Sequence, residues 1–151
     1  MERREAEIDT TATEQEAYIL DGQVGFLMRQ AQQRHASLFA ECFGDDLTPM
    51  QWAVIAKLAE IGACSQNLLG RYTAMDVATI KGVVERLNKR KLLLSRADPD
   101  DRRRVMISLS PAGRRLYERH LPDALRATEI TLKPLRPGDR ATLVRLLKQL
   151  R

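Results

Sequence analysis

The spacing of apolar residues predicts a mainly helical chain with one β-hairpin near its middle. Over residues 16–43, apolar side chains recur at intervals of three and four, as they do on a helix with one buried face. The same spacing returns near the carboxyl end, over 111–132 and 138–150. Over 92–109, two strand-like runs flank a turn, and the second alternates between apolar and polar residues, which indicates a hairpin.

The middle of the chain carries three signals for helix starts. The segment TPMQ, which begins at Thr48, is a capping box that starts one helix. Ser65 caps a short helix over 66–72 and, after a turn, Asp76 caps a helix over 77–91. The buried face predicted for this last helix consists of Ile80, Val83, Val84 and Leu87. Two helices joined by a short turn, each with an apolar side facing inward, predict a helix-turn-helix.

The hairpin that follows has a polar and basic turn. Residues 98–101 read Asp-Pro-Asp-Asp, a composition typical of turns. Arg102, Arg103 and Arg104 come directly after them. A basic hairpin that follows a helix-turn-helix pair is the wing of a winged helix-turn-helix.

The pattern therefore divides the chain into a central unit and flanking helices. Residues 47–110 are predicted to form the winged helix-turn-helix, and the acidic, uncapped residues 1–15 to form a disordered tail. The segments 16–46 and 111–151 carry apolar helix faces that the compact central unit cannot cover. Two copies of the chain can bury these faces against each other, so we expect an intertwined helical homodimer.

Charge supports an interaction between the central unit and nucleic acid. The 151-residue chain has a formal net charge of +5. Residues 81–104 alone hold nine Lys or Arg against four Asp or Glu, so their excess equals that of the whole chain. Clustered positive charge is typical of nucleic-acid-binding surfaces. The alternative for this cluster is an ordinary solvated basic face.

Several other classes of protein are disfavoured by the sequence. No apolar run approaches the roughly 18 residues of a membrane span, and the first 16 residues lack the apolar core of a secretory signal. We therefore expect a cytoplasmic protein without a membrane partner. The two histidines, His35 and His120, belong to different predicted helices, and no metal-spaced cluster, phosphate loop or nucleophile motif is present. Accordingly we expect no catalytic site, no metal and no cofactor.

The start of the helix over 77–91 supplies the candidates for reading bases in the major groove. Val77 can contact a thymine methyl group, Thr79 can donate or accept, and Lys81 can reach a base edge or a phosphate. Asp76 fits the role of helix cap better than that of a base reader. The full set of candidate DNA-binding residues is Ser65, Gln66, Asn67, Asp76, Val77, Thr79, Lys81, Arg86, Asp101, Arg102, Arg103 and Arg104.

From about residue 18 to its end, the chain resembles the MarR family of transcription regulators. The motifs that carry this resemblance are LTPMQWAVIAKL over 47–58, TAMDVATIKGVVERLNKRKLL over 73–93 and DPDDRRRVMISLSPAG over 98–113. The resemblance implies a homodimer that binds a palindromic operator as a repressor and is released by a small ligand, often an aromatic carboxylate. It also implies that Arg103 enters the minor groove, while Asp101 positions the wing by pairing with nearby basic groups.

The same resemblance places an effector cleft between the dimerisation helices and the DNA-binding lobe. The candidate ligand-binding residues are Met28, Arg29, Gln32, His35, Phe39 and Trp52. Gln32 and His35 are polar residues within an otherwise apolar stripe, and Arg29 or Arg34 could neutralise a carboxylate. The effector expected from these residues is an aromatic or heteroaromatic acid. The alternative for His35 is a core histidine whose ring is satisfied by ordinary packing.

Two other readings stay open. Cys42 and Cys64 raise the alternative of a repressor that senses oxidation through a thiol, although most such cysteines are inert packing residues. A winged domain used only for protein contacts is the second, and the basic charge on both groove-facing elements argues against it.

Overall fold

A computed structural model describes residues 17–151, so the predicted tail over 1–15 lies outside the described residues. Over this range the chain is mostly helical and carries a small antiparallel sheet. The elements, in order, are η1 (Leu20–Gly22, a 3-10 helix), α1 (Val24–Phe43), α2 (Pro49–Ile61), β1 (Cys64–Ser65), α3 (Gln66–Tyr72), α4 (Val77–Lys89), β2 (Leu93–Ala97), β3 (Val105–Leu109), α5 (Pro111–Leu132) and α6 (Pro137–Gln149). None of these helices is both long and apolar enough to span a membrane.

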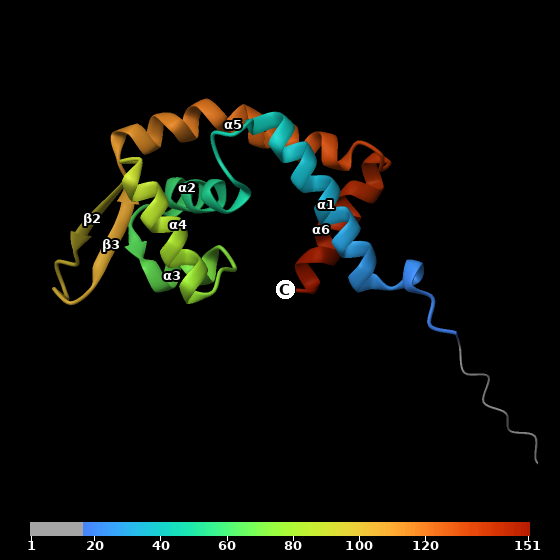
Figure 1. Cartoon of the computed structure of the whole chain (residues 1–151), viewed down its shortest axis with the longest axis horizontal. Coiled ribbons are helices and arrows are strands. Elements are labelled where there is room, and N and C mark those ends of the chain that lie inside the picture. Colours follow the sequence, from blue (N-terminus) through green and yellow to red (C-terminus); the bar gives the residue numbers. More distant parts are fainter. Residues whose placement is uncertain (1–16) are drawn as a thin grey trace, which may run out of the picture.

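The elements are grouped at two ends of the molecule (Figure 1). Helices α2, α3 and α4 and the sheet lie together at one end, and α1 and α6 lie at the other. Helix α5 runs along one side from the sheet to α6 and packs against α1 on the way. Helix α5 therefore connects the two ends of the molecule.

The core of the winged unit is formed by the faces that the sequence pattern predicted. The four expected residues of α4, Ile80, Val83, Val84 and Leu87, are all buried. Ile55 and Leu58 of α2 and Leu69 of α3 are among the most deeply buried side chains. Ile80 and Leu87 of α4 are buried to the same degree. Each of the predicted caps is present, so the helices begin where their local side-chain hydrogen bonds place them.

The sheet contains a strand that the sequence pattern did not predict. Strand β1 pairs antiparallel with β3, with Cys64 opposite Ile107 and Ser65 opposite Met106, and the strand order is β1-β3-β2. The expected two-stranded hairpin is thus a three-stranded sheet. Because β1 has only two residues, it cannot show an alternating pattern in the sequence.

The first long helix begins later than predicted. We expected it to start near residue 16, but α1 begins at Val24 and is preceded by η1. Gln23, at the N-cap position, makes no side-chain capping hydrogen bond. Gly22 and Gly25 also lie at this point, and glycine disfavours helix by up to about 1 kcal/mol relative to alanine.

Aromatic side chains connect α1 to the winged unit. The rings of Phe39 and Phe43 stack with centroids 4.0 Å apart. Phe43 also contacts Trp52 of α2, at 5.2 Å, and the ring of His120 of α5, at 5.1 Å. The carboxyl-terminal half of α1 is therefore fixed to both α2 and α5.

Asp46, in the loop between α1 and α2, joins the end of α4 to α5. Its carboxylate accepts from Arg90 at 2.6 Å, from His120 Nε2 at 2.6 Å and from Arg119 at 3.3 Å. Arg90 also donates to the Asp46 carbonyl oxygen at 2.6 Å. The hydrogen bond from His120 and the Arg90 guanidinium hold the pKa of the Asp46 carboxyl below its ordinary value, against the opposing effect of burial. Arg90 therefore has a structural role at the end of α4.

The lowered pKa of Asp46 predicts a pH-dependent contribution to stability. Ionised Asp46 stabilises the fold above its ordinary pKa of 3.8, and this contribution is lost as the pH falls through the lowered value. Near neutral pH, Asp46→Asn should reduce the free energy of unfolding by about 1–2 kcal/mol, a value limited because the side chain is 34% exposed. In urea unfolding, the difference from the native chain should shrink in acid. The control is Asp45→Asn, an exposed neighbour; equal effects of both changes at every pH would contradict the assignment.

Candidate DNA-binding surface and effector cavity

The amino-terminal end of α4 is capped and exposed. The Asp76 carboxylate accepts the backbone N–H of Thr79 at 2.7 Å. This backbone hydrogen bond lowers the pKa of the Asp76 carboxyl, so the cap stays ionised at neutral pH. Val77 is 70% exposed although it is apolar, while Thr79 is half-buried. An exposed apolar side chain can contact a thymine methyl group, and a hydroxyl group can hydrogen-bond a base edge.

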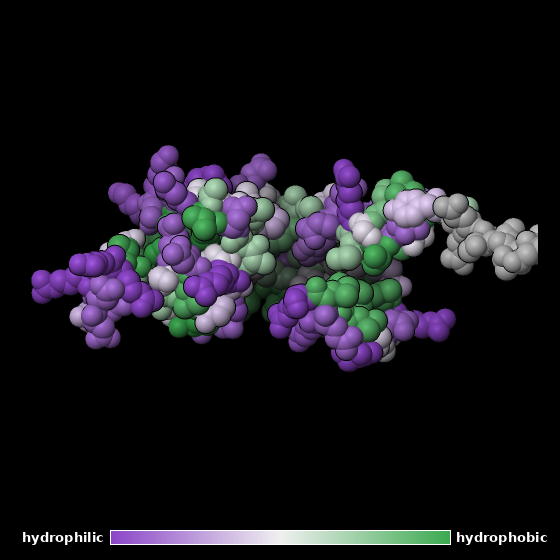
Figure 2. Space-filling model, turned by 90° about the horizontal axis from the view of Figure 1, so that it is seen from below, coloured by the Kyte–Doolittle hydropathy of each residue, from purple (hydrophilic) through white to green (hydrophobic). Residues whose placement is uncertain are grey.

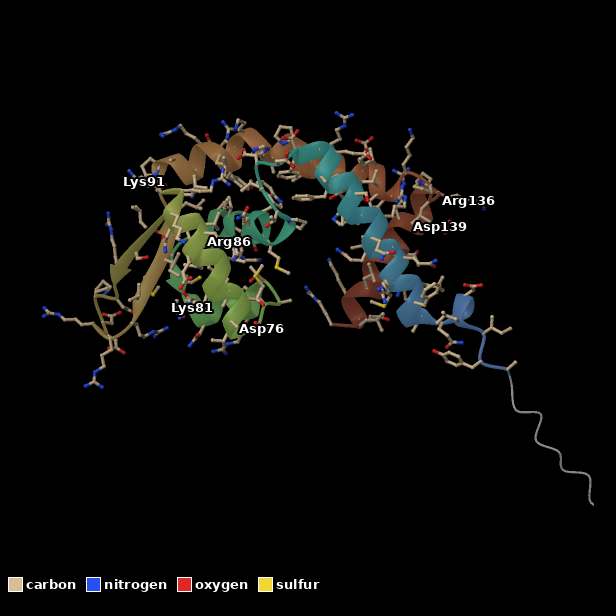
Figure 3. All side chains as sticks on the ribbon, viewed as in Figure 1. Asp76, Lys81, Arg86, Lys91, Arg136 and Asp139 are labelled. Atoms are coloured by element: carbon tan, nitrogen blue, oxygen red, sulfur yellow. The ribbon has the colours of Figure 1, made fainter. Side chains whose placement is uncertain are left out.

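The basic residues of α4 follow this exposed end. Lys81 and Arg86 lie along the helix between Asp76 and Lys91 (Figure 3). Both are exposed. The guanidinium of Arg86 lies over Gly82, where an added Cβ would be 3.4 Å from its Nη1 atom. The small residue at position 82 therefore lets Arg86 lie along the helix surface.

The start of α3 and the wing meet in one hollow of about 470 Å³. Its lining consists of Ser65, Gln66, Asn67, Arg71, Arg103, Arg104 and Val105. The pairing of β1 with β3 explains this meeting, because Ser65 lies opposite Met106, next to Val105. The strand that sequence reasoning missed is thus the element that brings two predicted groups of DNA-binding residues together.

A second hollow, of about 370 Å³, separates α3 from the start of α4. Its lining includes Asn67, Arg71, Asp76 and Val77. Asn67 and Arg71 line both hollows, so they connect the wing side of α3 to the α4 side. Sequence reasoning did not select Arg71, although its position four residues after Asn67 places both on one helix face.

The tip of the wing is shaped by its aspartates. Asp101 accepts the backbone N–H of Arg103 at 3.0 Å through its carboxylate, and its carbonyl oxygen accepts the N–H of Arg104 at 2.9 Å. The expected pairing of Asp101 with basic side chains is not observed within residues 17–151. A short side chain in this turn reaches the backbone two residues ahead more readily than a long side chain. Asp101 therefore fixes the turn that presents the exposed Arg102, Arg103 and Arg104.

A cavity of about 280 Å³ lies between α1, α2 and α5. It is lined by His35, Phe39, Trp52, Ala56, Tyr117, Leu121, Ala124, Leu125, Ala127 and Thr128. Three of the predicted ligand-binding residues, His35, Phe39 and Trp52, are among them. Sequence reasoning missed Tyr117, whose ring stacks on Trp52 with centroids 5.5 Å apart.

The other predicted ligand-binding residues do not line this cavity. Met28, Arg29 and Gln32 are exposed on α1, ahead of the part of the helix that borders the cavity. Arg34 donates to the carbonyl oxygens of Thr131 at 2.7 Å and Ile130 at 3.1 Å. Its guanidinium therefore supplies hydrogen bonds to carbonyl oxygens at the carboxyl-terminal end of α5. This contact takes the place of the expected neutralisation of a ligand carboxylate.

Comparison with known proteins identifies the family. A family model described as the MarR family matches residues 45–104, which include α2, α3, α4 and most of the wing. The HTH-type transcriptional repressor NicR of Pseudomonas putida is 37% identical to the chain over 134 residues, covering 88% of the chain and 85% of NicR. The chain belongs to the MarR family. This family consists of transcriptional regulators.

Solved structures of similar proteins confirm the winged-helix fold of this MarR-family chain. A probable transcriptional regulator from Pseudomonas aeruginosa is 54% identical, with a TM-score of 0.85 over 88% of the chain and 100% of that structure. BpsR of Bordetella bronchiseptica is 41% identical, with a TM-score of 0.86 over 89% of the chain and 96% of BpsR. The BpsR structure concerns regulation of its DNA binding by 6-hydroxynicotinic acid.

The cysteines of this MarR-family chain lie in apolar surroundings. Cys64 is buried in β1, and burial raises the pKa of its thiol. Cys42 is half-buried and packs against the core. A raised pKa reduces the fraction of the thiol that is ionised to thiolate. A redox-sensing cysteine reacts as the thiolate and therefore needs a larger ionised fraction. The environment of Cys64 therefore disfavours the redox alternative at that residue.

Proposed function

We propose that the chain represses transcription by binding a palindromic operator as a homodimer. The observation that carries this proposal is the convergence of α3, α4 and the wing. Seven of the twelve predicted DNA-binding residues, from three separated stretches of sequence, line two adjoining hollows. The other five, which line neither hollow, are Thr79, Lys81, Arg86, Asp101 and Arg102. Positive charge from Arg71, Arg103 and Arg104 borders these hollows, and phosphate contacts need such charge.

Each element has a distinct role on DNA. The start of α4 enters the major groove, where Val77, Thr79 and Lys81 contact base edges while Asp76 retains its capping role. Ser65, Gln66 and Asn67, together with Arg86, contact phosphates and set the position of α4. Arg103 enters the minor groove, and Arg102 and Arg104 contact the backbone beside it.

The flanking helices supply the dimer interface. Residues 16–46 and 111–151 are the proposed dimerisation region, and 47–110 the DNA-binding domain. Apolar residues are exposed over the end of the molecule formed by α1 and α6 (Figure 2). Val24 and Leu150 are 67% and 70% exposed, and α6 has no buried residue. A second copy that covers these side chains would place two α4 helices on half-sites about 34 Å apart.

The effector of this repressor is an aromatic or heteroaromatic acid that binds the cavity between α1, α2 and α5. The aromatic rings of Phe39, Trp52 and Tyr117 line this cavity, and apolar walls with a few polar groups are typical of small-molecule sites. Regulation of the similar BpsR by 6-hydroxynicotinic acid supports this ligand class. The acid releases DNA only if it binds the DNA-incompetent dimer more tightly than the competent one.

Base reading by α4 predicts a loss of specificity in Thr79→Ala. The Thr79 backbone N–H can still donate to the capping Asp76 carboxylate, so the helix keeps its cap while the hydroxyl group is removed. The ratio of operator affinity to random-DNA affinity should fall about fivefold, which corresponds to about 1 kcal/mol. Fluorescence anisotropy with both DNAs measures this ratio. Thr142→Ala, on α6, is the control and should leave the ratio of the two affinities unchanged. Equal losses of affinity for operator and random DNA in Thr79→Ala would exclude base reading by Thr79.

A further inference from the structure

The hydrogen bonds of Thr131 determine which nitrogen of His35 carries a proton. The Thr131 hydroxyl donates to the carbonyl oxygen of Ala127 at 2.6 Å. The same oxygen lies 2.8 Å from His35 Nδ1. A hydroxyl group has one proton, so Thr131 accepts from His35, and Nδ1 is the donor.

This assignment limits what the other ring nitrogen can do. In the neutral ring with a proton on Nδ1, Nε2 is an acceptor, and it becomes a donor only when the ring is an imidazolium. Nε2 has no hydrogen-bond partner within residues 17–151, and His35 lines the effector cavity. While Thr131 donates to Ala127, the neutral His35 ring carries its proton on Nδ1. The neutral ring therefore cannot donate from Nε2 to a ligand.

None of the described residues that line the cavity carries a fixed positive charge for a carboxylate. On α5, the ionisable lining residue is Tyr117, and on α2 the lining residues Trp52 and Ala56 do not ionise in water. On α1, the nearby guanidinium of Arg34 is held by the carbonyl oxygens at the end of α5. Among the described residues that line the cavity, His35 is the one whose side chain can take up a proton to become a cation.

We infer that an aromatic carboxylate entering this cavity takes up one proton from solvent at His35 Nε2, with Thr131 as the positioning residue. This inference rests on the proposed effector site. The new N–H donates to the carboxylate, and the ligand anion favours the charged ring. At pH values where the free ring is neutral, affinity should therefore fall by up to tenfold for each pH unit. A carboxamide, which can donate to neutral Nε2, should bind without proton uptake.

Isothermal titration calorimetry of the full chain with 6-hydroxynicotinic acid tests this inference. Titrations at about pH 7.5 in buffers of different ionisation enthalpy give the number of protons taken up, and the expected value is close to one. Binding without proton uptake would overturn the inference but leave the effector site in place. Failure of the acid both to bind and to release operator DNA would overturn the proposed site for this ligand class, and the inference with it.

Two variants separate proton uptake from a merely structural role. His35→Gln keeps a polar side chain that does not titrate, so proton uptake should vanish and the affinity should become independent of pH between about 6 and 8. Thr131→Val removes the hydroxyl acceptor and lets neutral His35 carry its proton on Nε2. Its proton uptake should therefore fall although the acid still binds. A weaker affinity with unchanged proton uptake in Thr131→Val would contradict the positioning role.

Discussion

Replacing Gly113 with alanine should lower the free energy of unfolding by about 3 kcal/mol. Gly113 lies in the first turn of α5, and its N–H donates to the capping Ser110 side chain at 3.0 Å. A Cβ atom at this position would lie 2.1 Å from the carbonyl oxygen of Leu92 and 3.3 Å from a methyl carbon of Leu109. The Leu92 oxygen also accepts the Ser110 N–H at 3.0 Å, so the backbone is held on both sides of the clash.

A glycine in a similar place provides the matched control. Gly138 lies in the first turn of α6, and an added Cβ there would meet nothing within 4 Å. Gly138→Ala should therefore be neutral or slightly stabilising, by up to about 1 kcal/mol. Equilibrium urea unfolding at one protein concentration compares the two variants. If Gly113→Ala is as stable as Gly138→Ala, the close packing of α5 against the start of β2 is contradicted.

Removing the Arg103 side chain should weaken operator binding at least about tenfold and reduce the salt dependence by about one unit of log–log slope. The guanidinium is exposed at the wing, which the Asp101 turn holds in place, and it lines the hollow beside α3. Arg103→Ala leaves its backbone N–H to Asp101 intact, so the turn should persist. The expected loss therefore reports the contact of the side chain with DNA.

The control for this variant is an arginine that lies outside both hollows. Arg126 is exposed on α5, and Arg126→Ala should leave operator affinity and its salt dependence unchanged. Anisotropy titrations over a range of salt concentrations measure both quantities for the two variants. Identical affinities and slopes for Arg103→Ala, Arg126→Ala and the native chain would remove the wing from the DNA-binding surface.

The sequence predicted the elements whose causes are local. The caps at Thr48, Ser65 and Asp76 each act over three residues, and each is present in the structure. The buried face of α4 follows directly from its helical period. Basic charge near the wing and in α4 was also visible without the fold. The helix-turn-helix could therefore be predicted from neighbouring residues alone, and its candidate DNA-binding residues were proposed on the same basis.

Features that join distant segments could not be predicted in this way. The pairing of Ser65 with Met106 and the bonds of Asp46 to Arg90 and His120 depend on how whole elements pack. The cavity proposed for the effector depends on the packing of α1 against α5. The spacing of α1 selected His35 correctly as a lining residue. It could not show that Met28 lies outside the cavity, because periodicity gives a face and not the length over which that face is covered.

The most direct test of the central claim is to sequence the genomic fragments that the purified chain binds. The account predicts enrichment of one inverted repeat whose half-sites are centred about one helical turn, roughly 34 Å, apart. It also predicts that two copies of the chain bind each inverted repeat. Recovery of fragments without a shared repeat, bound no more tightly than random DNA, would contradict sequence-specific operator binding by this winged helix-turn-helix.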